Sequence, residues 1–297
     1  MSLAQANKLQ EARGLLNAIN AILQIHHAEF PPASAPLAPT PPPIDADAIR
    51  DSCLEAALKG ISVFDRASRK AAKEQASRDA AARIQADTEQ FKREYLEYKA
   101  QLATWWNRLA TNDPDVVLYA LAEAFDDNYA AAAAVGVHKS EATLVVLVPG
   151  EDAVPEKMPS TTASGNLSLK KMTKKDHDGF YSLMVAGYTL VTIKEAFAVA
   201  PGLESVRVVV VRSTGLSAYG AKKGEVVLAA RFARMKLVGV QWSKVDAATI
   251  LNGVADELLL NVKGVNKSLQ ALDLTKEPDI AAVLETISFD ELSTKES

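Results

Sequence analysis

The chain has 297 residues, of which 48% are hydrophobic and 24% charged, and its formal net charge is −4. This composition supplies enough apolar surface for a folded core and excludes global disorder. It also excludes a uniformly basic nucleic-acid coat. No apolar run approaches 18 residues without a charge, which argues against a membrane span. Cys53 is the single cysteine, so an internal disulfide is excluded, and without a recognisable secretory leader we expect a cytoplasmic protein.

Residues 1–30 carry the pattern of an amphipathic helix. Their apolar side chains alternate at spacings of three and four, which lines them along one stripe. A stripe this apolar must pack on another surface. It consists of Leu9, Ala12, Leu16, Ile19, Leu23, His26 and Phe30, and it is widened by Leu15, Ile22 and Ile25.

Residues 31–44 form a proline-rich connector. Seven of the thirteen prolines fall between Pro31 and Pro43, where fixed φ angles and missing amide donors favour an extended chain. Residues 45–112 then contain a run without proline until the turn at their end, which predicts a long helix or coiled coil. Gly60 is a potential interruption of that helix.

The second half of residues 45–112 carries another heptad stripe. Its members again alternate at spacings of three and four, which predicts left-handed packing against another helix. Either the first helix folds back along the second, or the stripes pair between chains. We therefore expect a homo-oligomer or a protein partner. The stripe consists of Thr88, Phe91, Tyr95, Tyr98, Leu102, Trp105 and Leu109.

Residues 113–290 are expected to form an α+β domain, followed by a tail at 291–297. The predicted fold class is thus a long N-terminal helical hairpin or coiled coil, then a compact small-sheet domain covered by helices. Residues 144–148 are so uniformly apolar that both faces of their strand should be buried. The predicted elements are helices at 116–125, 174–199, 247–251 and 280–287, strands at 134–138, 143–148, 206–211, 225–234 and 258–262, with a candidate strand at 236–242 and loops at 149–173 and 213–224.

Catalytic signatures are mostly missing from the sequence. The four histidines include no pair at metal-ligand spacing, and one cysteine cannot build a thiolate zinc site. The glycines of residues 215–223 do not open a helix with a lysine directly after the second glycine, as a phosphate loop requires. We therefore predict no catalytic residue, cofactor or metal.

Two features keep other chemistry open. A metal-dependent nuclease of the restriction-endonuclease type would need an acid-x-lysine strand motif, which is missing, although Glu151 and Asp152 could be ligands. The spatial arrangement of these acids with Glu195 and Glu225 would decide between the alternatives. Basic residues also cluster, so nucleic acid is a candidate but not the favoured partner. The candidate phosphate contacts are Arg69, Lys70, Lys73, Lys170, Lys171, Lys174 and Lys175.

Four arginines lie within the predicted strands at 206–211 and 225–234 or directly next to them. Because a buried arginine needs a carboxylate partner, we expect structural ion pairs at Arg207, Arg212, Arg231 and Arg234.

The segments 144–156 (LVVLVPGEDAVPE), 194–203 (KEAFAVAPGL) and 228–232 (LAARF) resemble those of uncharacterised, alanine-rich actinobacterial proteins. The resemblance covers most of the chain from about residue 20. It implies a helical or coiled-coil region followed by a C-terminal α+β domain. That family has no assigned activity, so the resemblance implies no catalytic residue.

The leading functional hypothesis is a non-enzymatic interaction or scaffold protein. Its heptad helices would pack together or self-associate and present the α+β domain to a partner. The alternative is a nuclease or nucleic-acid-binding effector. A third hypothesis places a small ligand near the loop at residues 149–173.

Overall fold

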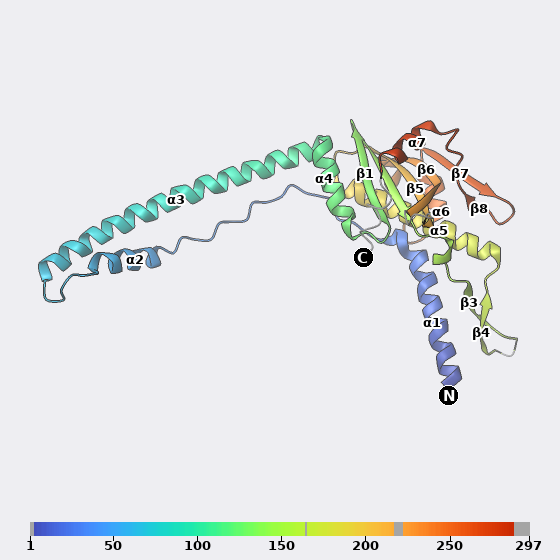
Figure 1. The fold of residues 1–297 in the computed structure, drawn as a ribbon, viewed down its shortest axis with the longest axis horizontal. Coiled ribbons are helices and arrows are strands. Elements are labelled where there is room, and N and C mark those ends of the chain that lie inside the picture. Colours follow the sequence, from blue (N-terminus) through green and yellow to red (C-terminus); the bar gives the residue numbers. More distant parts are fainter. Residues whose placement is uncertain (1–2, 164, 217–221, 288–297) are drawn as a thin grey trace. The chain divides into compact units, whose positions relative to one another are not determined.

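The computed structural model describes residues 3–163, 165–216 and 222–287 (Figure 1). The chain divides into two compact units, one formed by residues 1–33 and 108–297 and the other by residues 34–107. The predicted tail at 291–297 lies outside the described residues. The architecture is α+β, as expected, with a long helix preceding the sheet domain.

Residues 34–107 contain an extended segment followed by two helices. α2 (Ala46–Leu58) begins after Asp45, whose side chain accepts a hydrogen bond from the Ala48 amide. α3 (Arg66–Ala110) follows after a break. The long helix expected over 45–112 is therefore interrupted, and the break lies at the glycine that was the potential interruption. Gly60 adopts a φ of +82°, a conformation that glycine accepts readily and that ends a helix, and Asp65 then caps α3 by accepting from the Ser68 amide.

The other unit is built on a sheet of strand order β1-β2-β5-β6-β7-β8. β2 and β5 are parallel, and the remaining neighbours are antiparallel. A parallel pair needs a crossover connection, which runs through α5 (Lys174–Val199). The strands are β1 (Ala131–His138), β2 (Glu141–Val148), β5 (Ser205–Leu216), β6 (Lys222–Ala233), β7 (Glu257–Lys263) and β8 (Ser268–Gln270).

The central strands are buried on both faces, as predicted for residues 144–148. Val145 and Val209 belong to an apolar cluster on one face that includes Ile280 of α7 (Pro278–Glu285). Because side chains alternate along a strand, Leu144 and Val208 point to the opposite face, and both are fully buried. That face is covered by α5, while α4 (Pro114–Ala124) packs beside β1.

α5 is enclosed on most of its circumference. The sheet lies on one side, and α1 (Leu3–Gln24), the 3₁₀ turn Ile25–His27 and α6 (Ala247–Val254) contact the others. The turn can approach closely because Gly187 has no side chain: a Cβ there would lie 2.9 Å from the Cβ of Ile25. Within its own unit α1 packs on α5 and β3, contacts that the sequence did not indicate.

Several connections differ from their predictions. The expected loop at 149–173 contains a separate two-stranded hairpin of β3 (Lys157–Thr161) and β4 (Leu167–Lys171). The expected loop at 213–224 is shorter, because β5 and β6 remain paired out to Leu216 and Lys222; residues 217–221 lie outside the described residues. The candidate strand at 236–242 is a 3₁₀ turn followed by further turns, and β8 was not predicted.

α5 is also long and apolar enough to cross a membrane by length and composition alone. Within the structure it is the central core helix, and 61% of its most apolar window is buried. A core helix of this kind passes the same test, so the match is weak evidence for a span.

Two glycines of α5 provide a matched test of this packing. We expect Gly187→Ala to destabilise the fold, because overpacking against Ile25 costs about 1–3 kcal/mol and exceeds the gain of about 1 kcal/mol in helix propensity. Gly179→Ala has no neighbour within 4 Å of the added Cβ and should stabilise by about 0.5–1 kcal/mol. Urea denaturation of both variants measures the difference, and equal stabilities would contradict the close approach.

Candidate functional site

The heptad residues of α3 lie uncovered within their unit. Phe91 and Tyr98 are each 46% exposed and Trp105 is 38% exposed, while Tyr95 and Leu102 are half-buried. We call these five residues the α3 seam. Large apolar side chains in a continuous exposed row are uncommon on a soluble monomer and mark an interaction surface. The described residues of its own unit, 34–107, offer the seam no complete cover.

The buried side of the first helical segment overlaps the predicted stripe only in part. Ile19 lies inside, but Leu16 and Leu23 are exposed and Leu9 is half-buried. Ile22, which was expected only to widen the stripe, is buried. That buried side is formed by Ala12, Ile19, Ile22 and His26.

The candidate phosphate contacts form two groups that the structure assigns to different units. Arg69, Lys70 and Lys73 lie on α3, where the guanidinium of Arg69 donates to the carbonyl of Ile61 at 3.4 Å. The other four are exposed at the junction of two elements. Lys170 and Lys171 end β4, and Lys174 and Lys175 begin α5.

Two of the strand arginines share one carboxylate. Arg207 and Arg231 are cross-strand neighbours on β5 and β6, and both reach Glu141 of β2, at 3.7 and 2.6 Å. The Ser205 hydroxyl also donates to Glu141 at 2.7 Å. Burial raises the pKa of Glu141, but the hydrogen bonds from Ser205 and Arg231 outweigh it and hold the pKa below its usual range. This is the structural ion pairing that was expected.

Arg234 corrects that expectation, because it is bound to backbone rather than to a carboxylate. Its guanidinium donates to the carbonyls of Leu203, Phe197 and Ala200 at 2.7 to 2.9 Å. Two of these residues lie at the C-terminal end of α5, where backbone carbonyls lack helical partners. The cation satisfies them and adds favourable charge at the negative end of the helix dipole.

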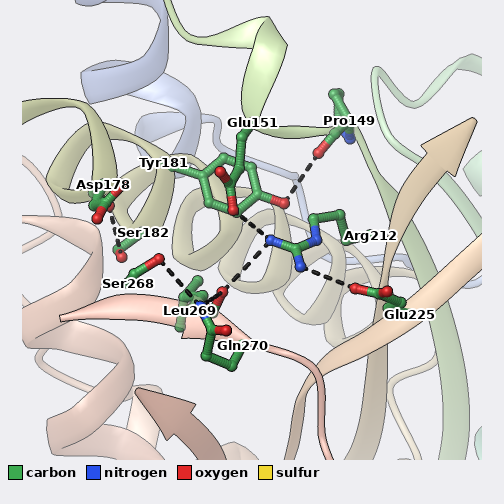
Figure 2. Close-up of polar contacts among 10 residues, drawn as sticks. All are labelled: Pro149, Glu151, Asp178, Tyr181, Ser182, Arg212, Glu225, Ser268, Leu269 and Gln270. Carbon is green, nitrogen blue, oxygen red and sulfur yellow. Dashed lines mark hydrogen bonds and ion pairs between the residues drawn. The ribbon is translucent and has the colours of Figure 1, made fainter. Parts of the chain in front are cut away.

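Arg212 lies between two acidic side chains, one that follows the carboxyl end of β2 and one on β6 (Figure 2). Its guanidinium contacts Glu151 at 2.5 Å and Glu225 at 2.9 Å, and it lies 5.9 Å from the ring centre of Tyr181. The Tyr181 hydroxyl donates to the carbonyl of Pro149 at 3.2 Å, and burial raises its pKa. The arginine thus pairs with Glu151, a candidate metal ligand, and with Glu225, one of the acids whose arrangement was in question.

The acids do not assemble into a recognisable metal centre. Within residues 3–163, 165–216 and 222–287, no group of three or more His, Cys, Asp or Glu side chains could hold a metal ion. Glu195 lies apart from Glu151 and Glu225, because it points from α5 toward Asn128.

A second feature of this unit is an apolar cavity of about 820 Å³ between α1 and α5. Met184, Tyr188, Val191 and Glu195 recur along α5 at spacings of four, three and four, so they share one face. Ile22 of α1 closes the opposite side. Cavities of this size with a few placed polar groups are the usual form of small-molecule sites.

Among the described residues that line this cavity, Glu195 is the buried charged group, with 6% of its surface exposed. The side-chain amide of Asn128 donates to one carboxyl oxygen at 2.7 Å, and no second hydrogen bond to the carboxyl is found in the described part of the chain. Burial raises the pKa of Glu195, and the charge of Asp127 raises it further. The sequence analysis named Glu195 only among the acids whose arrangement would test the nuclease hypothesis, and it did not predict an apolar cavity around it. The available signal was a charge inside the apolar face of a helix.

The neighbouring residue, Lys194, has a structural role. The ammonium group donates to the carbonyls of His26, at 3.1 Å, and Ala28, and lies 4.2 Å from the ring centre of Trp242. Burial lowers the pKa of Lys194. The lysine therefore holds the chain at the end of the first helical segment against α5. His26 itself is buried, and its Nε2 lies 3.0 Å from the carbonyl of Val245.

Searches against protein-family models, curated proteins and solved structures give no match for the chain. Function is therefore inferred from the geometry of the α3 seam and of the cavity.

Glu141 should stabilise the fold in a pH-dependent way. Its depressed pKa means that the stabilisation is present above the unfolded value of 4.5 and is lost as pH falls through the folded value. We expect Glu141→Gln to lower the free energy of unfolding by about 1–2 kcal/mol at pH 7, with a smaller loss at pH 3. Urea denaturation at both pH values measures this, and an equal loss at both would contradict the ion pairing.

Glu195 should have the opposite effect. Because its pKa is raised, the contribution of Glu195 to stability is present at low pH, below the unfolded value, and is lost as pH rises through the folded pKa. We expect Glu195→Gln to increase stability at pH 7 by about 1 kcal/mol, or about 2–4 °C in Tm, and to have no effect near pH 4. Calorimetry compares it with Glu257→Gln, an exposed control on β7. A loss of stability in Glu195→Gln alone would contradict the buried charge.

Proposed function

We propose that the protein is a non-enzymatic interaction protein in which α3 of one chain pairs with α3 of a second copy. The observation that carries the proposal is the α3 seam, whose heptad-spaced side chains are exposed in the single chain. A row with this spacing is buried efficiently by another helix of the same period, through knobs-into-holes packing. Burial of aromatic surface supplies the free energy of association.

Charges beside the seam select the partner and its direction. The seam begins at a heptad d position with Phe91, which places Asp87 and Glu94 at g positions and Lys92 and Lys99 at e positions. In a parallel, in-register pair, a g residue faces the e residue five positions later in the other chain. Asp87 then faces Lys92, and Glu94 faces Lys99. An antiparallel pair would bring like charges together, so these residues favour a parallel homodimer.

In this arrangement the paired α3 helices carry two α+β units, which would be available to a further partner. The exposed lysines at the β4–α5 junction would attract an acidic partner, including nucleic acid, to that unit. The nuclease hypothesis has less support, because Arg212 occupies both Glu151 and Glu225.

Substitution within the seam should dissociate the dimer. We expect Tyr98→Glu to weaken association at least tenfold, about 1.4 kcal/mol, because it places a charge at the centre of the helix pair. Leu96→Glu is the matched control: Leu96 is 54% exposed and lies on the opposite side of α3. Sedimentation equilibrium measures both. A monomeric wild-type chain at high micromolar concentration, or equal weakening by both variants, would refute the proposal.

The direction of pairing is tested with one engineered cysteine. In a Cys53→Ser background, Trp105→Cys places equivalent thiols side by side only in a parallel, in-register pair. Oxidation should then yield a disulfide-linked dimer. Failure to cross-link, with a dimer still observed by sedimentation, would reject the parallel arrangement. Glu94→Lys should weaken the pair, and adding Lys99→Glu should restore it by exchanging the two charges.

A further inference from the structure

The cavity between α1 and α5 combines an apolar lining with an uneven distribution of charge. Among the described residues that line it, Asp127 and Glu195 are acidic and none is basic. Asp127 is exposed, whereas Glu195 is deeply buried. An unpaired buried carboxylate is costly for a fold, and such groups concentrate at functional sites.

The hydrogen bonding of Glu195 leaves room for a ligand. Asn128 donates to one carboxyl oxygen, and the other has no protein donor in the described part of the chain. That oxygen is not among the fully buried polar atoms without a partner, so it stays accessible, and Glu195 lines the cavity. A carboxylate accepts hydrogen bonds and favours a cation. The nearby basic residue, Lys194, is directed to backbone carbonyls instead.

Aromatic rings add to the preference for a cation. Tyr188 and Tyr129 both line the cavity, and the face of a tyrosine ring attracts an ammonium group within about 6 Å. The remainder of the lining is aliphatic and includes Ile22, Met184 and Val191. It would bury the hydrocarbon body of a ligand away from water.

We propose that this cavity binds a hydrophobic amine, whose ammonium group pairs with Glu195 while its apolar body packs among Ile22, Met184 and Val191. The chemical class is an organic monocation with an alkyl or aryl body. A fatty acid is disfavoured by the two carboxylates. A neutral alcohol would gain the apolar contacts but not the ion pair. This site lies outside the α3 seam, and its occupation does not depend on self-association.

Isothermal titration calorimetry of the full chain at pH 7 tests the site with three eight-carbon probes. Octylamine should bind with one site for each chain and at least tenfold more tightly than octan-1-ol, and octanoate should not bind. Glu195→Gln should reduce octylamine affinity at least tenfold and leave octan-1-ol affinity nearly unchanged. Glu257→Gln, outside the cavity, should bind like the wild type. Circular dichroism melting confirms that each variant is folded.

A second variant tests the location. Ala21 lies on α1, lines the cavity and is exposed, so Ala21→Trp can fill the space from a tolerant position and should block both octylamine and octan-1-ol. The proposal is overturned if octylamine and octan-1-ol bind equally, if octanoate is preferred, or if no probe binds. Octylamine affinity that is unchanged in Glu195→Gln or in Ala21→Trp would also overturn it.

Discussion

The fold of the α+β unit depends on the burial of α5. The helix forms the crossover between the parallel strands β2 and β5 and is covered by the sheet, by α1 and by α6. A helix buried on several sides must fit several surfaces at once. Gly187 meets this constraint against Ile25, where a single methyl group would be too large. The position of α1, and with it the cavity, follows from that contact.

Because α5 is buried on several sides, its polar side chains must find hydrogen-bond partners inside the protein. Lys194 and Glu195 are adjacent in sequence but point in different directions, and their hydrogen-bond partners differ. The lysine is satisfied by backbone carbonyls and by the ring of Trp242. The glutamate has a single amide donor and an apolar cavity. The contacts of Lys194 are part of the fold. Glu195 has no cationic partner among the described residues, and this is the basis for the proposed ligand.

The two units use apolar surface differently. In the α+β unit, apolar residues of β2 and β5 are buried on both sides of the sheet, and this burial drives folding. On α3, the five residues of the seam stay in contact with solvent, although their spacing is equally regular. A regular apolar pattern in the sequence therefore corresponds to a buried surface in the α+β unit and to an exposed one on α3. A helix whose apolar stripe is not buried within its own unit can bury it against another chain.

Local chemistry allowed the sequence to determine several elements. The prolines of residues 31–44 prevent regular structure, and the uniform apolarity of residues 144–148 requires a strand buried on both faces. α5 was bounded correctly, because Thr173 caps its start and Pro201 follows its end. The interruption near Gly60 was visible only as a potential break, since a glycine can also lie within a helix.

The tertiary structure alone decided which side of α1 is buried, because its apolar residues occupy more than one line and only the partner surface selects among them. It also decided that Arg234 binds carbonyls and that Glu195 faces a cavity. These outcomes depend on which distant segments are brought together, and no local pattern in a single sequence records that arrangement.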